Sequence, residues 1–373
     1  MTATSMDIDA LRRSASDENA SFGAAKRPGF ASAARNAPRS AAGALLMQTV
    51  LARLGNSWAP TKYHTQNRRT LCAVVSDGNT NAVVKIRLET DGKHGMAKEH
   101  AALSRAYAGS DRGIPRPLHF FPDLHAMVIS EIPGVSLEYA VKRRWKSRAE
   151  VIGEVGSALS QFHDRTGRIE KVAAQLWHEK TVPPAIRAAC ETKAEHAWAD
   201  RVLEAYLAAA ERTRDDMVPF GFTHEDLVPR NVLVSGFDIG FIDFENSQET
   251  HCLNDLAQLA LGVQMLRGTP GRWRRHDRLG LGFSAVVLDT LCDGYGLLPS
   301  HQTHFATLLL RASLQCWHRA KQRGQNEQPY RQIQTASLRL ADRIARALNY
   351  AGPMDCVGGT VRSTMPASSG WAG

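Results

Sequence analysis

The segment from Phe222 to Asn246 constrains the chain more than any other part of the sequence; it reads FTHEDLVPRNVLVSGFDIGFIDFEN. Two short apolar runs, VLV and GFI, flank a Ser-Gly turn, and this pattern predicts a tight antiparallel hairpin. A hairpin brings its two ends together. We therefore expect Asp226, Asn231 and Asp243 to converge at one mouth of the hairpin.

Three oxygen-bearing side chains at one point suit a hard cation. Mg²⁺ prefers oxygen ligands and usually keeps several waters, so one carboxylate and one amide oxygen can hold it when substrate phosphates complete the shell. Asn231 and Asp243 are the expected metal ligands. Asp226 then remains free to accept the proton of a hydroxyl group, which is the role of a catalytic base.

The same segment resembles the catalytic loop and the metal loop of the aminoglycoside phosphotransferase family, which has a protein-kinase-like fold and includes choline kinase-like small-molecule kinases. The family pattern is H-G-D-x-x-x-x-N, then a short hairpin and I-D-[FW]-[DE]; the chain has His224 to Asn231 and Ile242 to Glu245 at these positions. The resemblance covers about residues 55–350. It implies an ATP- and Mg²⁺-dependent phosphotransferase that acts on a hydroxyl of a small molecule or glycan.

Other positions extend the resemblance upstream and downstream. Lys85, in a Val-rich strand, resembles the lysine that holds the ATP phosphates, and Glu99 resembles its helix partner. The stretch MVISEIPGVSL resembles the hinge between two lobes, where the carbonyl of Ser130 and the amide of Ile132 would bond the adenine. Asp255 resembles an aspartate that braces the catalytic loop. The alternative for Lys85 is an edge-strand lysine exposed to water.

Two departures from the family pattern favour a second hypothesis. Glu225 stands where the family has a glycine, and no glycine-rich phosphate loop precedes Lys85; the turn at 76–79 is a weak substitute. The alternative function is a pseudokinase-like nucleotide-binding or scaffolding module without turnover. Glu245 also fits two roles, a second carboxylate near the metal or a loop cap.

The periodicity of the apolar residues indicates a small strand-rich lobe followed by a larger helical lobe. With the resemblance, this predicts an α+β, protein-kinase-like two-lobed fold with an antiparallel-sheet N-lobe and a mainly helical C-lobe. The predicted domains are a disordered tail over 1–44, the N-lobe over 45–132, the C-lobe over 133–350 and a flexible tail over 351–373. The predicted local elements are a hairpin around 77–79, a strand over 125–129, and helices over 96–107, 151–163, 253–266, 281–293 and 303–320.

The amino-acid composition limits which binding partners and which cellular compartment are expected for the protein. The net charge of +9 is spread without a basic block on the scale of a nucleic-acid-binding arm, so no nucleic acid partner is expected. Six cysteines without a C-x-x-C pair indicate reduced thiols in a cytoplasmic protein. No apolar run approaches the length of a membrane-spanning helix, so no transmembrane segment is expected.

The class of acceptor follows from spacing and charge. Only twelve positions separate Asp243 from Asp255, and no A-P-E follows, so the chain lacks the long segment on which protein kinases bind peptides. A small molecule or glycan is therefore favoured. Two basic clusters, at 142–148 and 267–278, are either solvated faces or recognise an anionic acceptor.

Overall fold

The computed structural model describes residues 10, 12 and 14 and the ranges 41–55, 57–66, 69–88, 95–108, 112–143, 148–171, 182–266, 277–323 and 328–350. The C-terminal tail predicted over 351–373, most of the N-terminal tail and the centres of both basic clusters lie outside the described residues. The chain divides into two compact units. The first consists of Met1–Arg168 and Pro219–Arg267, and the second of Ile169–Val218 and Gly268–Gly373.

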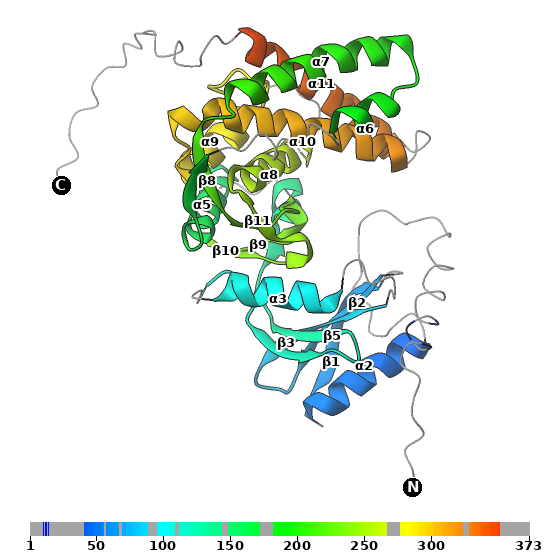
Figure 1. Ribbon diagram of the computed structural model, residues 1–373. Helices are drawn as coiled ribbons and strands as arrows, with labels where there is room; N and C mark the ends of the chain where they lie inside the picture. Colours follow the sequence, from blue (N-terminus) through cyan, green and yellow to red (C-terminus); the bar gives the residue numbers. More distant parts are fainter. Residues whose placement is uncertain are drawn as a thin grey trace, which may run out of the picture. The chain divides into compact units, whose positions relative to one another are not determined.

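The first unit combines antiparallel strands with helices, as expected for the predicted α+β fold (Figure 1). Its elements are α2 (Ala41–Leu54), β1 (Ala59–Gln66), β2 (Thr70–Ser76), β3 (Asn81–Arg87), α3 (Met96–Tyr107), β4 (Pro117–Phe121), β5 (Ala126–Ser130), β6 (Val135–Ser136), α4 (Leu137–Lys142), α5 (Arg148–Asp164), η2 (Pro229–Asn231), β9 (Val232–Ser235), β10 (Asp238–Phe241), η3 (Phe244–Asn246), β11 (Gln248–His251) and α8 (Leu253–Leu266). The unit boundaries fall within β7 (Arg168–Lys171) and β8 (Met217–Thr223).

Five strands of this unit form one antiparallel sheet in the order β1-β2-β3-β5-β4. The hairpin predicted around 77–79 is confirmed, because β2 and β3 pair with Ser76 opposite Asn81. The Asp77 carboxylate closes the turn by accepting the N–H groups of Asn79 and Thr80 at 2.9 and 2.7 Å. This Asx-type turn sets the register of β3.

Strand β3 presents different side chains to the two faces of the sheet. Its alternate residues Ala82, Val84 and Ile86 are buried in a core that the apolar face of α2 shares. Because side chains alternate across a strand, Lys85 and Arg87 belong to the opposite face. In Figure 1, α3 lies on the other side of this sheet from α2. The burial of one face thereby places both cations of β3 on the face where the polar site is built.

Helix α2 begins at Ala41, inside the span predicted as a disordered tail, and it covers the sheet with Leu46, Met47 and Val50. Residues 10, 12 and 14 of that span are helical as well. The structure therefore has folded segments in a region whose sequence lacks a sustained apolar period. Burial of α2 against the sheet stabilises a helix that the local sequence pattern does not indicate.

The predicted hairpin of the catalytic segment is also present. Strands β9 and β10 pair with Val232 opposite Phe241, and β6 adds to the other edge of β9. The connection from β5 to β6 approaches β9 so closely that a Cβ atom on Gly134 would lie 2.6 Å from the Val234 oxygen, and its φ is +128°. Glycine is required there for both reasons.

The second unit is mainly helical. Its elements are α6 (Val182–Ala188), α7 (Lys193–Arg212), α9 (Ala285–Tyr295), η4 (Pro299–His301), α10 (Gln302–Arg323) and α11 (Gln328–Tyr350). In its core the rings of Trp198 and Trp317 lie 5.0 Å apart. Among the described residues of the whole chain, no helix is both long and apolar enough to cross a membrane.

Most of the predicted helices are confirmed, and one begins later than predicted. Helices α3 and α8 have the predicted bounds, whereas α9 begins at Ala285 rather than at 281. The preceding residues form a loop, because the Asp277 carboxylate accepts the N–H groups of Leu281 and Phe283 at 2.8 Å. Gly282 has a φ of +86°, which a helix does not allow.

Candidate active site

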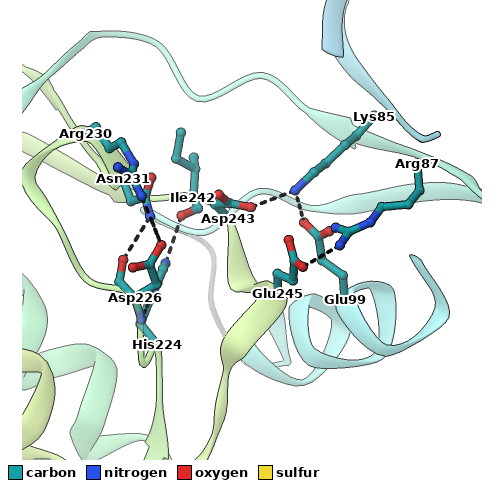
Figure 2. Close-up of polar contacts among 10 residues, drawn as sticks. All are labelled: Lys85, Arg87, Glu99, His224, Asp226, Arg230, Asn231, Ile242, Asp243 and Glu245. Carbon is teal, nitrogen blue, oxygen red and sulfur yellow. Dashed lines mark hydrogen bonds and ion pairs between the residues drawn. The ribbon is translucent and has the colours of Figure 1, made fainter. Parts of the chain in front are cut away.

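Lys85 joins three elements of the first unit (Figure 2). Its Nζ atom lies 2.5 Å from Glu99 Oε1 of α3 and 2.7 Å from Asp243 Oδ1, which follows β10. The side chains of Lys85 and Glu99 are 13% and 2% exposed. The structure thus excludes the alternative of an edge-strand lysine in water, and β3 is an interior strand of its sheet.

Lys85 is the shared partner of two carboxylates, and it shifts the pKa values of both. Burial would lower the pKa of Lys85, but the charges of Glu99 and Asp243 raise it above its ordinary value. Burial raises the pKa of Glu99, and Lys85 compensates only in part. Burial also opposes ionisation of Asp243, but Lys85 outweighs it and lowers the pKa of Asp243. Glu99 is therefore the carboxylate whose charge is least compensated.

A second ion pair lies beside the first. Arg87 Nη2 is 2.8 Å from Glu245 Oε1, and the Arg87 side chain is 4% exposed. Carboxylate oxygens of Glu99, Asp243 and Glu245 lie within 4.8 Å of one another. With Lys85 and Arg87 included, this cluster carries three formal negative charges and two positive ones. It has the excess negative charge that a further cation would balance.

Asp255 of α8 holds the start of the catalytic loop, which we define as residues 224–231. Its carboxylate accepts the main-chain N–H groups of His224 and Glu225 at 2.6 and 2.8 Å, and it lies 3.1 Å from His163 Nε2 of α5. Burial would raise the pKa of Asp255, but the hydrogen bonds with the His163 side chain and the His224 N–H lower it. Asp255 thus occupies the bracing position that the sequence indicated.

His224 connects the catalytic loop to the metal loop, which we define as residues 242–245. Its Nε2 atom is 2.8 Å from the Ile242 carbonyl, so this nitrogen must carry the hydrogen, and Nδ1 can accept the Asp226 N–H at 3.4 Å. The N–H of Ile242 donates to the Asn231 carbonyl at 3.0 Å. These bonds fix Asp243 beside the loop that carries Asp226 and Asn231. They give His224 a structural role, which leaves Asp226 as the expected base.

Asp226 and Asn231 face each other across the catalytic loop. Asn231 Nδ2 donates to the Asp226 carbonyl at 2.9 Å and lies 3.3 Å from Asp226 Oδ2. The amide nitrogen is thereby turned to Asp226, and the amide oxygen is the atom that Asn231 can offer to a cation. Arg230 Nη2 also lies 3.3 Å from Asp226 Oδ2, with a side chain that is 63% exposed.

Glu225, the departure from the family pattern, adopts a left-handed conformation with a φ of +62°. This conformation explains why the family pattern has glycine at this position. The Glu225 carboxylate bonds the Asn254 amide of α8 and lies 3.4 Å from both Thr223 Oγ1 and Gln248 Nε2. The larger residue is therefore accommodated by polar neighbours, with the main chain held by Asp255.

The expected hinge residues lie where the chain leaves the sheet. Ser130 ends β5, and its N–H and Oγ bond the main chain of Arg116. Ile132 packs on β10, where a Cβ atom on Gly240 would lie 2.5 Å from Ile132 Cγ2. Ser130 is the last residue of β5 and Ile132 lies on the connection from β5 to β6; their bonds to adenine stay predictions.

The turn at 76–79 is unsuited to hold phosphates through its main chain. The N–H groups of Asn79 and Thr80 donate to Asp77, that of Gly78 to Ser76 Oγ, and that of Asp77 to the Thr80 carbonyl. The N–H groups that could bind a phosphate are therefore engaged within the turn. These internal bonds are consistent with the prediction that the turn is a weak substitute for a glycine-rich loop.

Sequence reasoning missed Arg87 and Arg230 as members of this site. A signal for Arg87 was present, because the alternation of β3 places it on the same face as Lys85, and Glu245 stands two positions after Asp243. Arg230 carried no comparable signal, because its position next to Asp226 depends on the turn η2.

No curated protein sequence matches this chain significantly. Solved structures do match. That of aminoglycoside phosphotransferase APH(4)-Ia has a TM-score of 0.58 and 12% identity, over 83% of this chain and 100% of that one. A choline/ethanolamine kinase family protein from Mesorhizobium loti has a TM-score of 0.56 and 17% identity, over 84% and 97%. Amicoumacin kinase hAmiN has a TM-score of 0.54 and 13% identity, over 80% and 93%.

At such low sequence identities, these structural matches establish a shared two-lobed, kinase-like fold and no more. Residues 56–303 match a family model whose description is "Phosphotransferase enzyme family". The matched span includes Lys85 and the whole of the catalytic and metal loops. Because it covers well over half of the chain, the protein belongs to this phosphotransferase family, APH.

Proposed function

We propose that this phosphotransferase moves the γ-phosphoryl group of ATP to a hydroxyl of a small molecule, with Mg²⁺ as the metal. The supporting observation is the Lys85 cluster, in which one ammonium group contacts Glu99 and Asp243 while the metal loop is bonded to the loop of Asp226. Lys85 would bind the α- and β-phosphates, and Glu99 would hold its ammonium group. The Lys85 ammonium group is thus linked, through Asp243 and the metal loop, to the loop that carries the proposed base, and this link supports the proposal.

The donor set fits a hard divalent cation. Asp243 offers a carboxylate whose pKa is lowered by Lys85, so it is ionised at neutral pH, and Asn231 offers its amide oxygen. A bound Mg²⁺ would neutralise charge on the phosphate oxygens during transfer. Asn231 and Asp243 are the proposed ligands. The structure of hAmiN was determined with AMP-PNP and Ca²⁺, so that relative holds both kinds of group.

Asp226 is the proposed catalytic base. Its carboxylate would accept the proton of the acceptor hydroxyl as the new bond forms between that oxygen and the γ-phosphorus. The bond from the γ-phosphorus to its bridging oxygen breaks, and ADP leaves with the electron pair. Catalysis of this kind is mainly positioning and charge neutralisation, so the base and the metal ligands contribute comparably.

The acceptor is proposed to be a small molecule or a glycan, and anionic acceptors are one class to test. One APH(4)-Ia structure contains hygromycin B, and the hAmiN structure contains its ligand Ami. Residues 131–350, which supply the proposed acceptor side, have a net charge of +2. That charge gives no particular support to a polycationic acceptor.

The test combines binding with turnover. The protein is mixed with ATP and MgCl2, ADP release is followed across a panel of neutral, cationic and anionic alcohols, and melting is followed with AMP-PNP. Metal-dependent nucleotide protection together with acceptor-dependent ADP release is expected. Asp226→Asn should keep the protection and lower turnover by roughly 10²–10⁴-fold, the usual contribution of a positioned base.

The control is Asp238→Asn. Asp238 is the first residue of β10, beside the turn of the β9–β10 hairpin, and its side chain is exposed, so this change should leave turnover unchanged. Full turnover by Asp226→Asn would contradict the assignment of the base. Protection without ADP release on every acceptor would instead favour the pseudokinase-like module.

A further inference from the structure

We propose that Arg87 and Glu245 form a second tie between β3 and the metal loop, and that this tie positions Asp243 for its metal. The inference rests on the proposed function, because it concerns how the metal ligand is held. Neither residue would touch the nucleotide or the acceptor in this role. Both are positioning residues that act through Asp243.

The geometry of the two ion pairs carries the inference. Lys85 and Arg87 are two residues apart on β3, and their partners Asp243 and Glu245 are two residues apart in the metal loop. The two contacts are 2.7 and 2.8 Å long. Figure 2 shows them side by side, with the metal loop facing β3. Two parallel contacts fix the direction of the loop as well as its distance, which a single contact does not.

The main chain of Arg87 is bonded on both sides. The N–H of Arg87 donates to the His125 carbonyl at 2.9 Å, and the Arg87 carbonyl accepts from Arg12 Nε at 3.0 Å. Arg12 is 1% exposed and comes from the N-terminal segment. Both main-chain groups of Arg87 are therefore bonded, and its guanidinium group starts from a fixed backbone. A fork-shaped donor on a fixed backbone is well suited to orient a carboxylate.

The two ties differ in what a bound nucleotide would do to them. Lys85 is the group expected to contact phosphates, so its contact with Asp243 competes with its role in binding. Arg87 is 4% exposed and is already bonded to Glu245. The Arg87 tie can therefore persist while Lys85 turns toward the nucleotide. A buried ion pair is often no more stabilising than apolar residues of the same size, so a positional role accounts for it better than stability does.

The competing role for Glu245 is that of a direct metal ligand, since its carboxylate lies within 4.8 Å of those of Glu99 and Asp243. The two roles predict different effects at Arg87. If Glu245 only positions the loop, removal of either partner breaks the same tie, and the double variant is no worse than each single one. If Glu245 binds the metal, neutralising Arg87 frees a ligand and does not weaken metal binding.

The experiment measures AMP-PNP binding by calorimetry, without metal and across a MnCl2 titration, for the full chain and its variants. The variants are Glu245→Gln, Arg87→Gln, both together, and Arg87→Lys in case the buried arginine is needed for folding. Glu249→Gln is the matched control, because Glu249 of β11 also pairs with arginines, Arg105 and Arg168, but lies outside the metal loop. Thermal melting verifies that each variant is folded.

We expect Glu245→Gln and Arg87→Gln each to raise the Mn²⁺ concentration needed for tight binding by about tenfold, and the double variant by the same factor. Affinity for AMP-PNP without metal should not change, and Glu249→Gln should behave as the wild type. Arg87→Lys should recover part of the loss, because it keeps the charge but not the fork.

Two results would overturn the inference while leaving the proposed function in place. One is a wild-type metal requirement in Glu245→Gln. The other is a loss in Glu245→Gln that Arg87→Gln and Arg87→Lys do not share, which would assign Glu245 as a metal ligand. A wild-type protein that binds AMP-PNP without any gain from Mn²⁺ would overturn the proposed metal dependence and this inference with it.

Discussion

Glu99 has the most unusual environment of any carboxylate in the site. Within the described part of the chain, its Oε2 atom is buried without a hydrogen-bond partner, and Oε1 shares Lys85 with Asp243. Burial raises the pKa of Glu99 above its ordinary value, so a proton binds Glu99 more tightly in the folded state than in the unfolded chain. The stability linked to this group is therefore present at low pH and is lost as the pH rises through the folded-state pKa.

Glu99→Gln should consequently leave the melting temperature at neutral pH unchanged or raise it, because it removes a charge that the fold compensates poorly. The same variant should weaken AMP-PNP binding by about tenfold, since Lys85 loses one of the two groups that orient it. Calorimetry and melting measure the two effects separately. A clear loss of stability at neutral pH, with unchanged affinity, would contradict this account of Glu99.

At the scale of the catalytic loop, Glu225 combines a conformational cost with several polar contacts. Its φ of +62° costs an ordinary residue about 1 kcal/mol relative to glycine. Glu225→Ala and Glu225→Gly both remove the contacts with Thr223, Gln248 and Asn254. The two variants differ in the Cβ atom that the left-handed conformation disfavours.

We therefore expect Glu225→Gly to be more stable than Glu225→Ala by about 1 kcal/mol in urea unfolding. Turnover should change little in either variant, because Asp255 holds the main chain of the loop from the other side. Equal stabilities would show that the loop relaxes to another conformation when the side chain is shortened. A large loss of turnover in both variants would give the Glu225 carboxylate a direct role in the reaction.

Asp255 connects three elements, since it joins the loop after β8 to His163 of α5 and lies itself on α8. Its pKa is lowered in the folded state, so the unfolded chain binds more protons near the ordinary pKa of 3.8. The stability from Asp255 is therefore present above that pH and is lost as the pH falls through the lower, folded-state pKa.

Asp255→Asn should destabilise the protein at neutral pH by about 3 kcal/mol, because an amide oxygen replaces a carboxylate that accepts two buried N–H groups. The variant should also lose less stability than the wild type when the pH falls below about 4. Urea unfolding as a function of pH measures both effects. If the free energy of unfolding fell equally in both proteins as the pH was lowered, the pKa of Asp255 would not differ between the folded and unfolded states.

At the scale of the whole molecule, the residues proposed to bind the nucleotide and the metal and to act as the base all lie in the first of the two compact units. A bound ligand stabilises the protein only against local unfolding that destroys the binding site. At a ligand concentration one hundred times Kd, it adds about 2.7 kcal/mol to the free energy of that unfolding. AMP-PNP with Mg²⁺ should therefore slow hydrogen exchange in β3, α3 and the metal loop. Exchange in the core of α10 and α11, in the second unit, should change less.

Exchange followed by mass spectrometry resolves these segments. Arg346→Gln, which removes an exposed ion pair of α11, serves as a control that should leave the ligand effect unchanged. Protection of α10 and α11 equal to that of β3 would show that the chain opens as a single unit. No protection of β3 would contradict the location of the nucleotide site.

The local sequence pattern was sufficient to predict many of the secondary-structure elements of this protein. The alternation of β3, the Asx turn before it, the hairpin of β9 and β10 and the bounds of α3 and α8 follow from period and turn chemistry, which depend on neighbours in sequence. The spacing of Asp226, Asn231 and Asp243 also indicated a common site. Their chemical roles stay predictions.

Only the tertiary structure decided which distant groups meet. Lys85 contacts Asp243 and Arg87 contacts Glu245 across 158 positions, Asp255 reaches back to the catalytic loop, and an N-terminal arginine bonds the end of β3. The later start of α9 likewise depends on Asp277 accepting N–H groups that a helix would leave unsatisfied. A sequence pattern records the period of an element, whereas the partner of a buried charge is set by which elements pack together.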